Sequence, residues 1–241
     1  MALAGLEYEN LLSALDTALA HQLLIAGIYE ALDEYWDATQ EHQRGIAVGE
    51  RARTALAQYP AERLRGEDGF YLMRVSGDVA QRQIKLRMYQ EAAATYLAQL
   101  PHIEQLQGYP EQQRGQWKAT VYHQLGYVAQ EQRQWLQAEH SYQQALALTI
   151  EFNDRYSQAS TYHQLGRVAQ EQRQWPQARE YLMQDLTISA EFSDEHGLGI
   201  TLQSLARLRT ASGDESLAAA VAQVLGVSVE EVERRFESLR H

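Results

Sequence analysis

An internal repeat of 40 residues constrains the fold of this chain more than any other feature of its sequence. The segment 122–126, with the sequence YHQLG, returns at residues 162–166, and fifteen of the seventeen positions 122–138 are identical 40 residues later. A period of this length is typical of solenoids built from helical pairs, because one pair cannot bury its apolar face without a neighbour. The repeat therefore predicts an all-α fold of stacked antiparallel helix pairs.

The composition agrees with this fold class and indicates the cellular compartment in which the protein works. The 241 residues are 45% apolar, and four prolines and fifteen glycines are too few for a loop-rich all-β sandwich. The absence of cysteine excludes disulfides, thiolate nucleophiles and cysteine-ligated metal centres. The apolar stretches at residues 23–29 and 217–225 are too short to span a membrane, and the N-terminus lacks the basic region of a signal peptide. We therefore expect a cytoplasmic protein without a membrane partner.

The balance of charge argues against a nucleic-acid partner. Thirty-two acidic residues against twenty-one basic ones give a formal net charge of −11. Such a chain repels a phosphate backbone unless it carries a local basic patch, and the sequence contains no basic run.

Small residues recur where the two helices of a repeat must meet. Gly126 and Ala138 predict a close approach of these helices, because neither has the bulk to hold them apart. Trp135 and Trp175 open the second helix of each pair and are predicted to anchor it in the core, with contact to a partner as the second interpretation.

This alternation of small and large residues resembles the tetratricopeptide repeat, in the longer-period form of kinesin light chains and many bacterial signalling proteins. The resemblance rests on Leu125, Gly126, Ala129, Ala138, Tyr142 and Ala145. The second repeat departs from the pattern at Asp185, which takes the position of Ala145, and the proline that often closes the family's repeat is missing from both. The resemblance implies a right-handed α-solenoid, the superhelix of this family.

We predict four regions along the chain. They are residues 1–65, N-terminal helices with a divergent first repeat; 66–118, a divergent repeat with an irregular connection near Pro101 and Pro110; 119–212, the regular repeats and the start of a third; and 213–241, the C-terminal capping helices. In the first region, Ile28, Leu32, Trp36, Gly45 and Ala52 follow the frame of the repeat.

Several helix ends are marked by capping residues. Asp154 and Asp194 stand 40 residues apart, where an aspartate can cap the next helix. Ser212–Glu215 and Ser228–Glu231 each have the spacing of a capping box, which predicts a helix start at both.

The first fifty residues carry a second resemblance. The segment Glu7–Leu15, followed by Leu32, Tyr35-Trp36, Gly45 and Glu50, is similar to the start of the helical-repeat arm of bacterial STAND (NB-ARC-type) signalling ATPases. In that family the arm follows a nucleotide-binding domain and a winged helix, and it senses an inducer or partner. No G-x-x-x-x-G-K-[ST] phosphate loop occurs in this sequence. The resemblance therefore implies a detached or excised sensor arm, with an NTPase domain in cis or in trans as a candidate partner.

The sequence contains no pattern typical of catalysis. No G-x-S-x-G motif is present, and the carboxylate pairs Asp33-Glu34 and Glu230-Glu231 are interpreted as solvated helix charge. We predict no catalytic, cofactor-binding or metal-binding residue, no cofactor and no enzyme activity. His123 and His163 occupy equivalent positions and leave three interpretations open: contact with a partner, plain helix surface, or metal ligation. A spacing of about 8–10 Å between neighbouring helices disfavours the last.

The tetratricopeptide resemblance also implies where a partner binds. In that family the first helix of each pair lines a concave groove, and residues on either side of the Leu-Gly pair make the contacts. Carried onto this chain, the predicted partner-binding groove consists of His123, Tyr127, Gln130, Glu131, His163, Arg167, Gln170, Glu171, Gln203 and Arg207. Arg167 and Arg207 could pair with a carboxylate or an acidic peptide. The other interpretation is that they cover leucine-rich helix surface or bond Glu171.

Three functions are compatible with these features. The first is a non-enzymatic protein–protein interaction module that binds a peptide or partner protein in its groove, as a sensor or scaffold arm of a bacterial signalling protein. The alternative is a receptor for a small signal peptide or small-molecule inducer. The third class, an all-helical enzyme or nucleic-acid binder, predicts turnover or salt-dependent binding. The sequence leaves the oligomeric state open.

Overall fold

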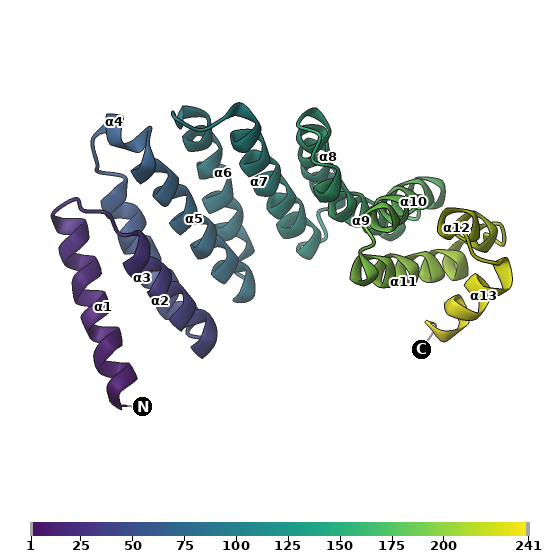
Figure 1. The fold of residues 1–241 in the computed structure, drawn as a ribbon, viewed down its shortest axis with the longest axis horizontal. Helices are drawn as coiled ribbons and strands as arrows, with labels where there is room; N and C mark the ends of the chain where they lie inside the picture. Colours follow the sequence, from purple (N-terminus) through teal and green to yellow (C-terminus); the bar gives the residue numbers. More distant parts are fainter. Residues whose placement is uncertain (1, 240–241) are drawn as a thin grey trace. The chain divides into compact units, whose positions relative to one another are not determined.

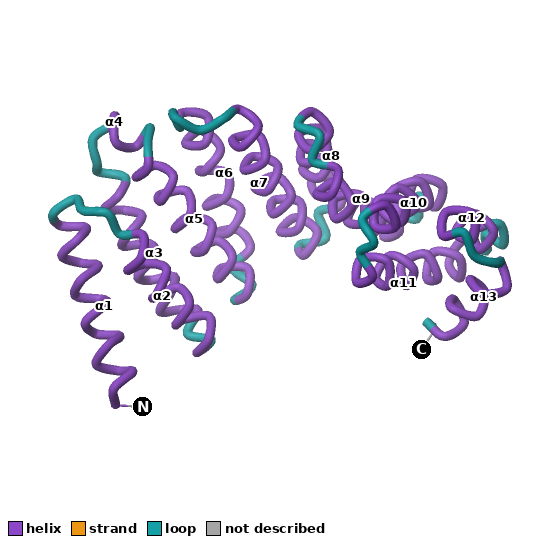
Figure 2. Tube along the Cα trace, viewed as in Figure 1, coloured by secondary structure: helices purple, strands orange, loops and turns teal. Residues whose placement is uncertain are grey.

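The computed structural model describes residues 2–239, with side chains described from residue 7 onward. All regular structure in this part of the chain is α-helical, which confirms the predicted class (Figures 1 and 2). The helices are α1 (Ala2–Ala20), α2 (Ala26–Thr39), α3 (His42–Leu56), α4 (Ala61–Leu64), α5 (Glu67–Lys85), α6 (Tyr89–Gln105), α7 (Glu111–Glu131), α8 (Trp135–Glu151), α9 (Arg155–Glu171), α10 (Trp175–Glu191), α11 (Glu195–Ser212), α12 (Leu217–Leu225) and α13 (Val229–Ser238).

The chain forms two compact units. The first ends at Val121 and the second begins at Tyr122, so α7 contributes residues to both. The four regions expected from the sequence divide the chain more finely than this, and they stay a prediction. Within residues 2–239, every helix is too short or too polar to cross a membrane.

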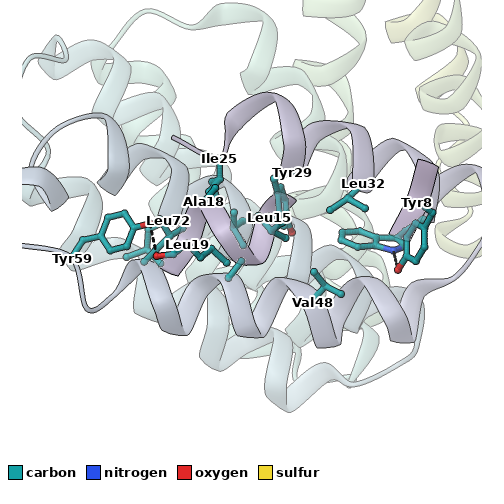
Figure 3. Packing of buried hydrophobic residues seen from close by; sticks show 14 residues of the cluster. Tyr8, Leu15, Ala18, Leu19, Ile25, Tyr29, Leu32, Val48, Tyr59 and Leu72 are labelled. Carbon is teal, nitrogen blue, oxygen red and sulfur yellow. Dashed lines mark hydrogen bonds between the residues drawn. The ribbon is translucent and has the colours of Figure 1, made fainter. Parts of the chain in front are cut away.

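The core of the first unit gathers apolar side chains from α1, α2, α3 and α5 (Figure 3). Leu32 and Trp36 of α2 are fully buried there, and the indole Nε1–H of Trp36 donates to the hydroxyl of Tyr8 at 3.2 Å. Ala52 of α3 is also fully buried. These residues lie on the inward faces that the repeat frame predicts for the N-terminal region.

An arginine in the same unit is almost completely buried. Arg82 of α5 is 3% exposed, contacts the carboxylates of Asp33 at 2.7 Å and Asp37 at 3.0 Å, and lies over the ring of Trp36. Gly45 makes room for it, because a Cβ there would come within 2.7 Å of the arginine side chain. The interpretation of Asp33 as solvated helix charge is therefore wrong, since it neutralises a buried cation.

The second unit keeps the 40-residue period in its turns as well as in its helices. Arg133 ends the turn after α7, Arg173 the turn after α9, and Gly213 follows α11, and all three are left-handed, with φ of 57°, 58° and 71°. Glycine adopts this conformation without strain, whereas arginine does so at some cost. A left-handed residue therefore stands at the equivalent position of all three turns, although only the third is a glycine.

The predicted close approach of paired helices is present in both regular repeats. A Cβ added to Gly126 would lie 2.6 Å from the ring of Tyr142 on α8, and one added to Gly166 would lie 2.7 Å from Leu182 on α10. Trp135 and Trp175 are half-buried and pack against the cores of their repeats. In each pair, the glycine of the first helix thus packs directly against a large buried side chain of the second helix.

Most of the predicted helix starts are confirmed. Asp154 accepts a hydrogen bond from Ser157 N, Asp194 from Gly197 N, and Ser228 from Glu231 N. The capping box at Ser212–Glu215 is wrong, because Ser212 ends α11 and its hydroxyl donates to the carbonyl of Leu208, one turn earlier.

The irregular connection in residues 66–118 lies beside Pro110, one of the two prolines named for it, and not at Pro101. Pro101 is inside α6, and the connection runs from Leu106 to Pro110. Proline removes one backbone hydrogen bond from a helix, yet α6 continues through Pro101, with Tyr96 and Ile103 buried on either side of it.

We predict that Gly166→Ala lowers the free energy of unfolding by about 1–3 kcal/mol, because the added methyl group overpacks the contact with Leu182. Gly199→Ala is the matched control. Gly199 is also within a helix, but no atom lies within 4 Å of the place where its Cβ would be, so alanine should stabilise by about 1 kcal/mol. Urea unfolding of the two variants tests this. A Gly166→Ala protein as stable as the parent would contradict the packing described.

Candidate functional site

The two regular repeats bury a histidine at the same place but surround it differently. His123 of α7 packs edge-on against the ring of Tyr142, at 5.2 Å between centroids, and its Nδ1 lies 3.3 Å from the hydroxyl of Thr161. Burial lowers the pKa of His123 to about 4, so its imidazole stays neutral near pH 7. In the first repeat the histidine is thus part of a mostly apolar contact.

In the second repeat, three inward positions of α10 change. Tyr142, Ala145 and Thr149 of α8 correspond to Leu182, Asp185 and Ser189. The carboxylate of Asp185 is 3% exposed and lies 2.9 Å from Nδ1 of His163. A methyl group beside the first histidine has therefore become a buried carboxylate beside the second.

Two hydroxyl groups complete the surroundings of this carboxylate. Thr201 Oγ1 of α11 lies 2.5 Å from Oδ2 of Asp185, and Ser189 donates to Oδ1 at 3.2 Å. Thr201 also lies 2.8 Å from the carbonyl of Gly197, so its single proton has two acceptors. We call His163, Asp185, Ser189 and Thr201 the α9–α11 polar cluster. It joins α9, α10 and α11 by hydrogen bonds between buried groups.

The polar cluster lies at one side of a pocket between α9 and α11, with α10 beneath, which we call the α9–α11 pocket. Its volume is about 460 Å³. The lining consists of Tyr156, Ser157, Ala159, Ser160, His163, Gln164, Arg167, Asp185, Ser189, Asp194, Gly197, Ile200 and Thr201. Within the described residues, no Lys or Arg forms an ion pair with Asp185, and His163 is its basic partner.

The structure divides the predicted groove residues into two groups. Six are at least partly exposed and lie along α7, α9 and α11: Tyr127, Glu131, Arg167, Glu171, Gln203 and Arg207. Tyr127, Arg167 and Arg207 occupy equivalent positions, as do Glu131 and Glu171. The remaining four, His123, Gln130, His163 and Gln170, form contacts inside the fold. Gln130 accepts from the hydroxyl of Tyr142 at 3.2 Å, whereas Gln170, whose repeat has leucine there, donates to the carbonyl of Ser204 at 3.0 Å.

The pocket brings together two of the predicted residues, His163 and Arg167. The guanidinium of Arg167 donates to Gln164 at 3.3 Å and is exposed. Asp185, Ser189 and Thr201 were not predicted as site residues. The signal for Asp185 was present in the sequence, because it is a charged residue at a position that is alanine in the preceding repeat.

The geometry offers little support for a bound metal. In the described part of the chain, no three His, Asp or Glu side chains converge closely enough to hold a metal ion. The expectation that the protein uses no metal stays a prediction.

Comparison with known proteins agrees with the helical architecture. Residues 117–191 match the family model described as tetratricopeptide repeat. The crystal structure of BtubC (BKLC) from P. vanneervenii has a TM-score of 0.65 and 16% identity over 96% of this chain and 92% of its own. The putative kinesin light chain of nearly identical TPR-like repeats from Podosopora anserina has a TM-score of 0.63 and 18% identity over 90% of this chain and 94% of its own.

No curated protein sequence matches the chain. At these identities the two structural likenesses show the fold alone. The fold is thus an all-α repeat solenoid, and residues 117–191, which include the two regular repeats, match the tetratricopeptide repeat model. Tetratricopeptide repeats are in general protein–protein interaction modules. The right-handed sense expected for the superhelix stays a prediction.

We predict that His163→Ala destabilises the chain by about 3 kcal/mol, because it leaves Asp185 buried without its basic partner. Asp185→Ala restores the residue found in the first repeat, where the histidine contacts a threonine hydroxyl and a tyrosine ring instead of a carboxylate, and should change stability by less than about 1 kcal/mol. His123→Ala measures the loss of a buried imidazole without a carboxylate. Urea unfolding that shows Asp185→Ala as the more damaging of the two second-repeat variants would contradict this account.

Proposed function

We propose that this chain is a non-enzymatic protein-interaction module that binds an extended or helical segment of a partner along the exposed face of α7, α9 and α11. The observation that carries the proposal is the recurrence of accessible side chains at equivalent positions of successive first helices: Tyr127, Arg167 and Arg207 at one position, and Glu131 and Glu171 one turn later. Gln203 lies one turn before Arg207 on α11 and extends this row. A periodic row of this kind can contact a partner that runs across the repeats.

The position of the α9–α11 pocket supports binding along the same face. It opens between two first helices, and Arg167 belongs both to its lining and to the accessible row. A bound segment that follows the row can therefore place one side chain in the pocket. Interfaces of this kind concentrate their binding energy in a few side chains that fill such pockets.

The proposal includes a cellular role. The resemblance of the N-terminal residues to the sensor arm of bacterial STAND ATPases supports a sensor or scaffold arm of a cytoplasmic signalling protein, working with an NTPase domain in cis or in trans. We also propose that the chain has no membrane partner and no nucleic-acid partner. The net charge of −11 argues against binding to a nucleic acid.

A second candidate is a receptor for a small signal peptide or small-molecule inducer. The volume of the α9–α11 pocket, about 460 Å³, favours it, since pockets for small ligands span roughly 300–1,000 Å³. In this second candidate function, the small signal peptide or the small-molecule inducer would bind in the α9–α11 pocket.

The test uses peptides selected on the purified chain from a random peptide library. Gln203→Trp places a bulky ring on the accessible row of α11, outside the pocket, and should weaken binding of the selected peptides at least about tenfold, or about 1.4 kcal/mol. Gln144→Trp is the matched control, since Gln144 is equally exposed on α8, the second helix of its pair.

Fluorescence polarisation with labelled peptides measures both affinities. The proposal fails if the two variants bind equally well, or if Gln144→Trp has the larger effect. Failure to select any peptide would also count against an extended partner and would leave the small-ligand receptor as the better interpretation of this face.

A further inference from the structure

We propose that the α9–α11 pocket is a subsite for the cationic side chain of a lysine or arginine in the bound segment. The proposal rests on the proposed function, because it names the chemistry of one contact in that groove. It is carried by the charge of the α9–α11 polar cluster, by the free nitrogen of His163 and by the apolar lip of the pocket.

The polar cluster contains a carboxylate that no guanidinium or ammonium group of the described residues neutralises. Asp185 is 3% exposed, and its partners are the imidazole of His163 and the hydroxyl groups of Ser189 and Thr201. A charge buried this deeply is screened less by solvent than a charge on the surface. A cation entering the pocket would place a permanent positive charge near this carboxylate, which its neutral hydrogen-bond partners do not supply.

His163 lines the pocket and has one ring nitrogen that Asp185 does not contact. Its Nδ1 is occupied by Asp185, so Nε2 is the nitrogen left for a bound group. When Nδ1–H donates to a carboxylate, the Nε2 of a neutral imidazole is a hydrogen-bond acceptor. An ammonium or guanidinium group can donate to it and lie close to the negative charge of Asp185.

The lip of the pocket is apolar and accessible. Tyr156 is 57% exposed and Ile200 is 42% exposed, and both line the pocket. The ring of Phe192, also exposed, contacts that of Tyr156 at 5.4 Å between centroids. Lysine and arginine have methylene stems that pack against such surfaces, and an aromatic ring attracts the cation itself.

Charge on the wider surface favours the same partner. Residues 122–241 contain sixteen acidic residues, ten arginines and no lysine. Asp194 adds a second carboxylate to the lining, against Arg167 as the one guanidinium among the lining residues. Arg167 is exposed and bonded to Gln164, so solvent screens its repulsion of a bound cation more strongly than it screens the buried Asp185.

The experiment follows the imidazole signals of His163 by NMR at pH 8, with three capped amino acids as probes: the N-acetyl methylamides of lysine, norleucine and glutamate. The lysine compound should shift these signals in a saturable way and bind at least about tenfold more tightly than the norleucine compound, which has the same stem without the charge.

Asp185→Asn keeps the shape of the side chain and removes its charge, and it should weaken binding of the lysine compound at least about tenfold. Asp154→Asn is the matched control. Asp154 lies outside the pocket and caps α9, a role that asparagine also fills, so its substitution should leave the affinity unchanged.

Three results would overturn the proposal: equal binding of the lysine and norleucine compounds, tighter binding of the glutamate compound, or no saturable shift with lysine. Because Gln203 lies outside the pocket, each of these results is compatible with loss of peptide binding in Gln203→Trp. The cationic subsite can therefore fail while the proposed function stands.

Discussion

The contact between a glycine on one helix and a large side chain on the next sets the geometry of the 122–241 unit. Gly166 allows α9 and α10 to approach until Leu182 fills the space that a Cβ would take. Asp185 lies one turn further along α10 and is thereby brought within 2.9 Å of His163. A wider helix spacing would separate the carboxylate from the imidazole, so the polar cluster depends on an apolar contact.

The two regular repeats share one backbone arrangement but differ in the buried contacts around their histidine and glutamine side chains. In the first, an apolar contact keeps the imidazole of His123 neutral, and the hydroxyl of Tyr142 satisfies Gln130. In the second, leucine cannot supply that hydroxyl, and Gln170 bonds the next helix instead. Burying a carboxylate is unfavourable unless it takes part in hydrogen bonds, and Asp185 has three hydrogen-bond partners.

Much of the fold could be predicted from the sequence because its signals are local. The 40-residue identity, the small residue at Gly126 and the caps at Asp154 and Asp194 each depend on neighbouring positions. Two of the three partners of Asp185, His163 and Thr201, come from α9 and α11, and which helix faces meet is a property of the stacked structure. The sequence therefore marked Asp185 as a departure from the repeat without showing that it binds His163.

The side chains of α10, rather than the backbone, change the surroundings of the repeat's histidine from an apolar contact to a polar cluster. Replacing Tyr142 by leucine and Ala145 by aspartate gives α8 the inward residues of α10 at these two positions, beside an unchanged His123. An NMR titration of His123 in this double variant and in Tyr142→Leu alone tests the claim. We predict that the pKa of His123 rises well above its value of about 4 only in the double variant, because the carboxylate favours the protonated imidazole. A folded double variant in which that pKa stays near 4 would contradict the account.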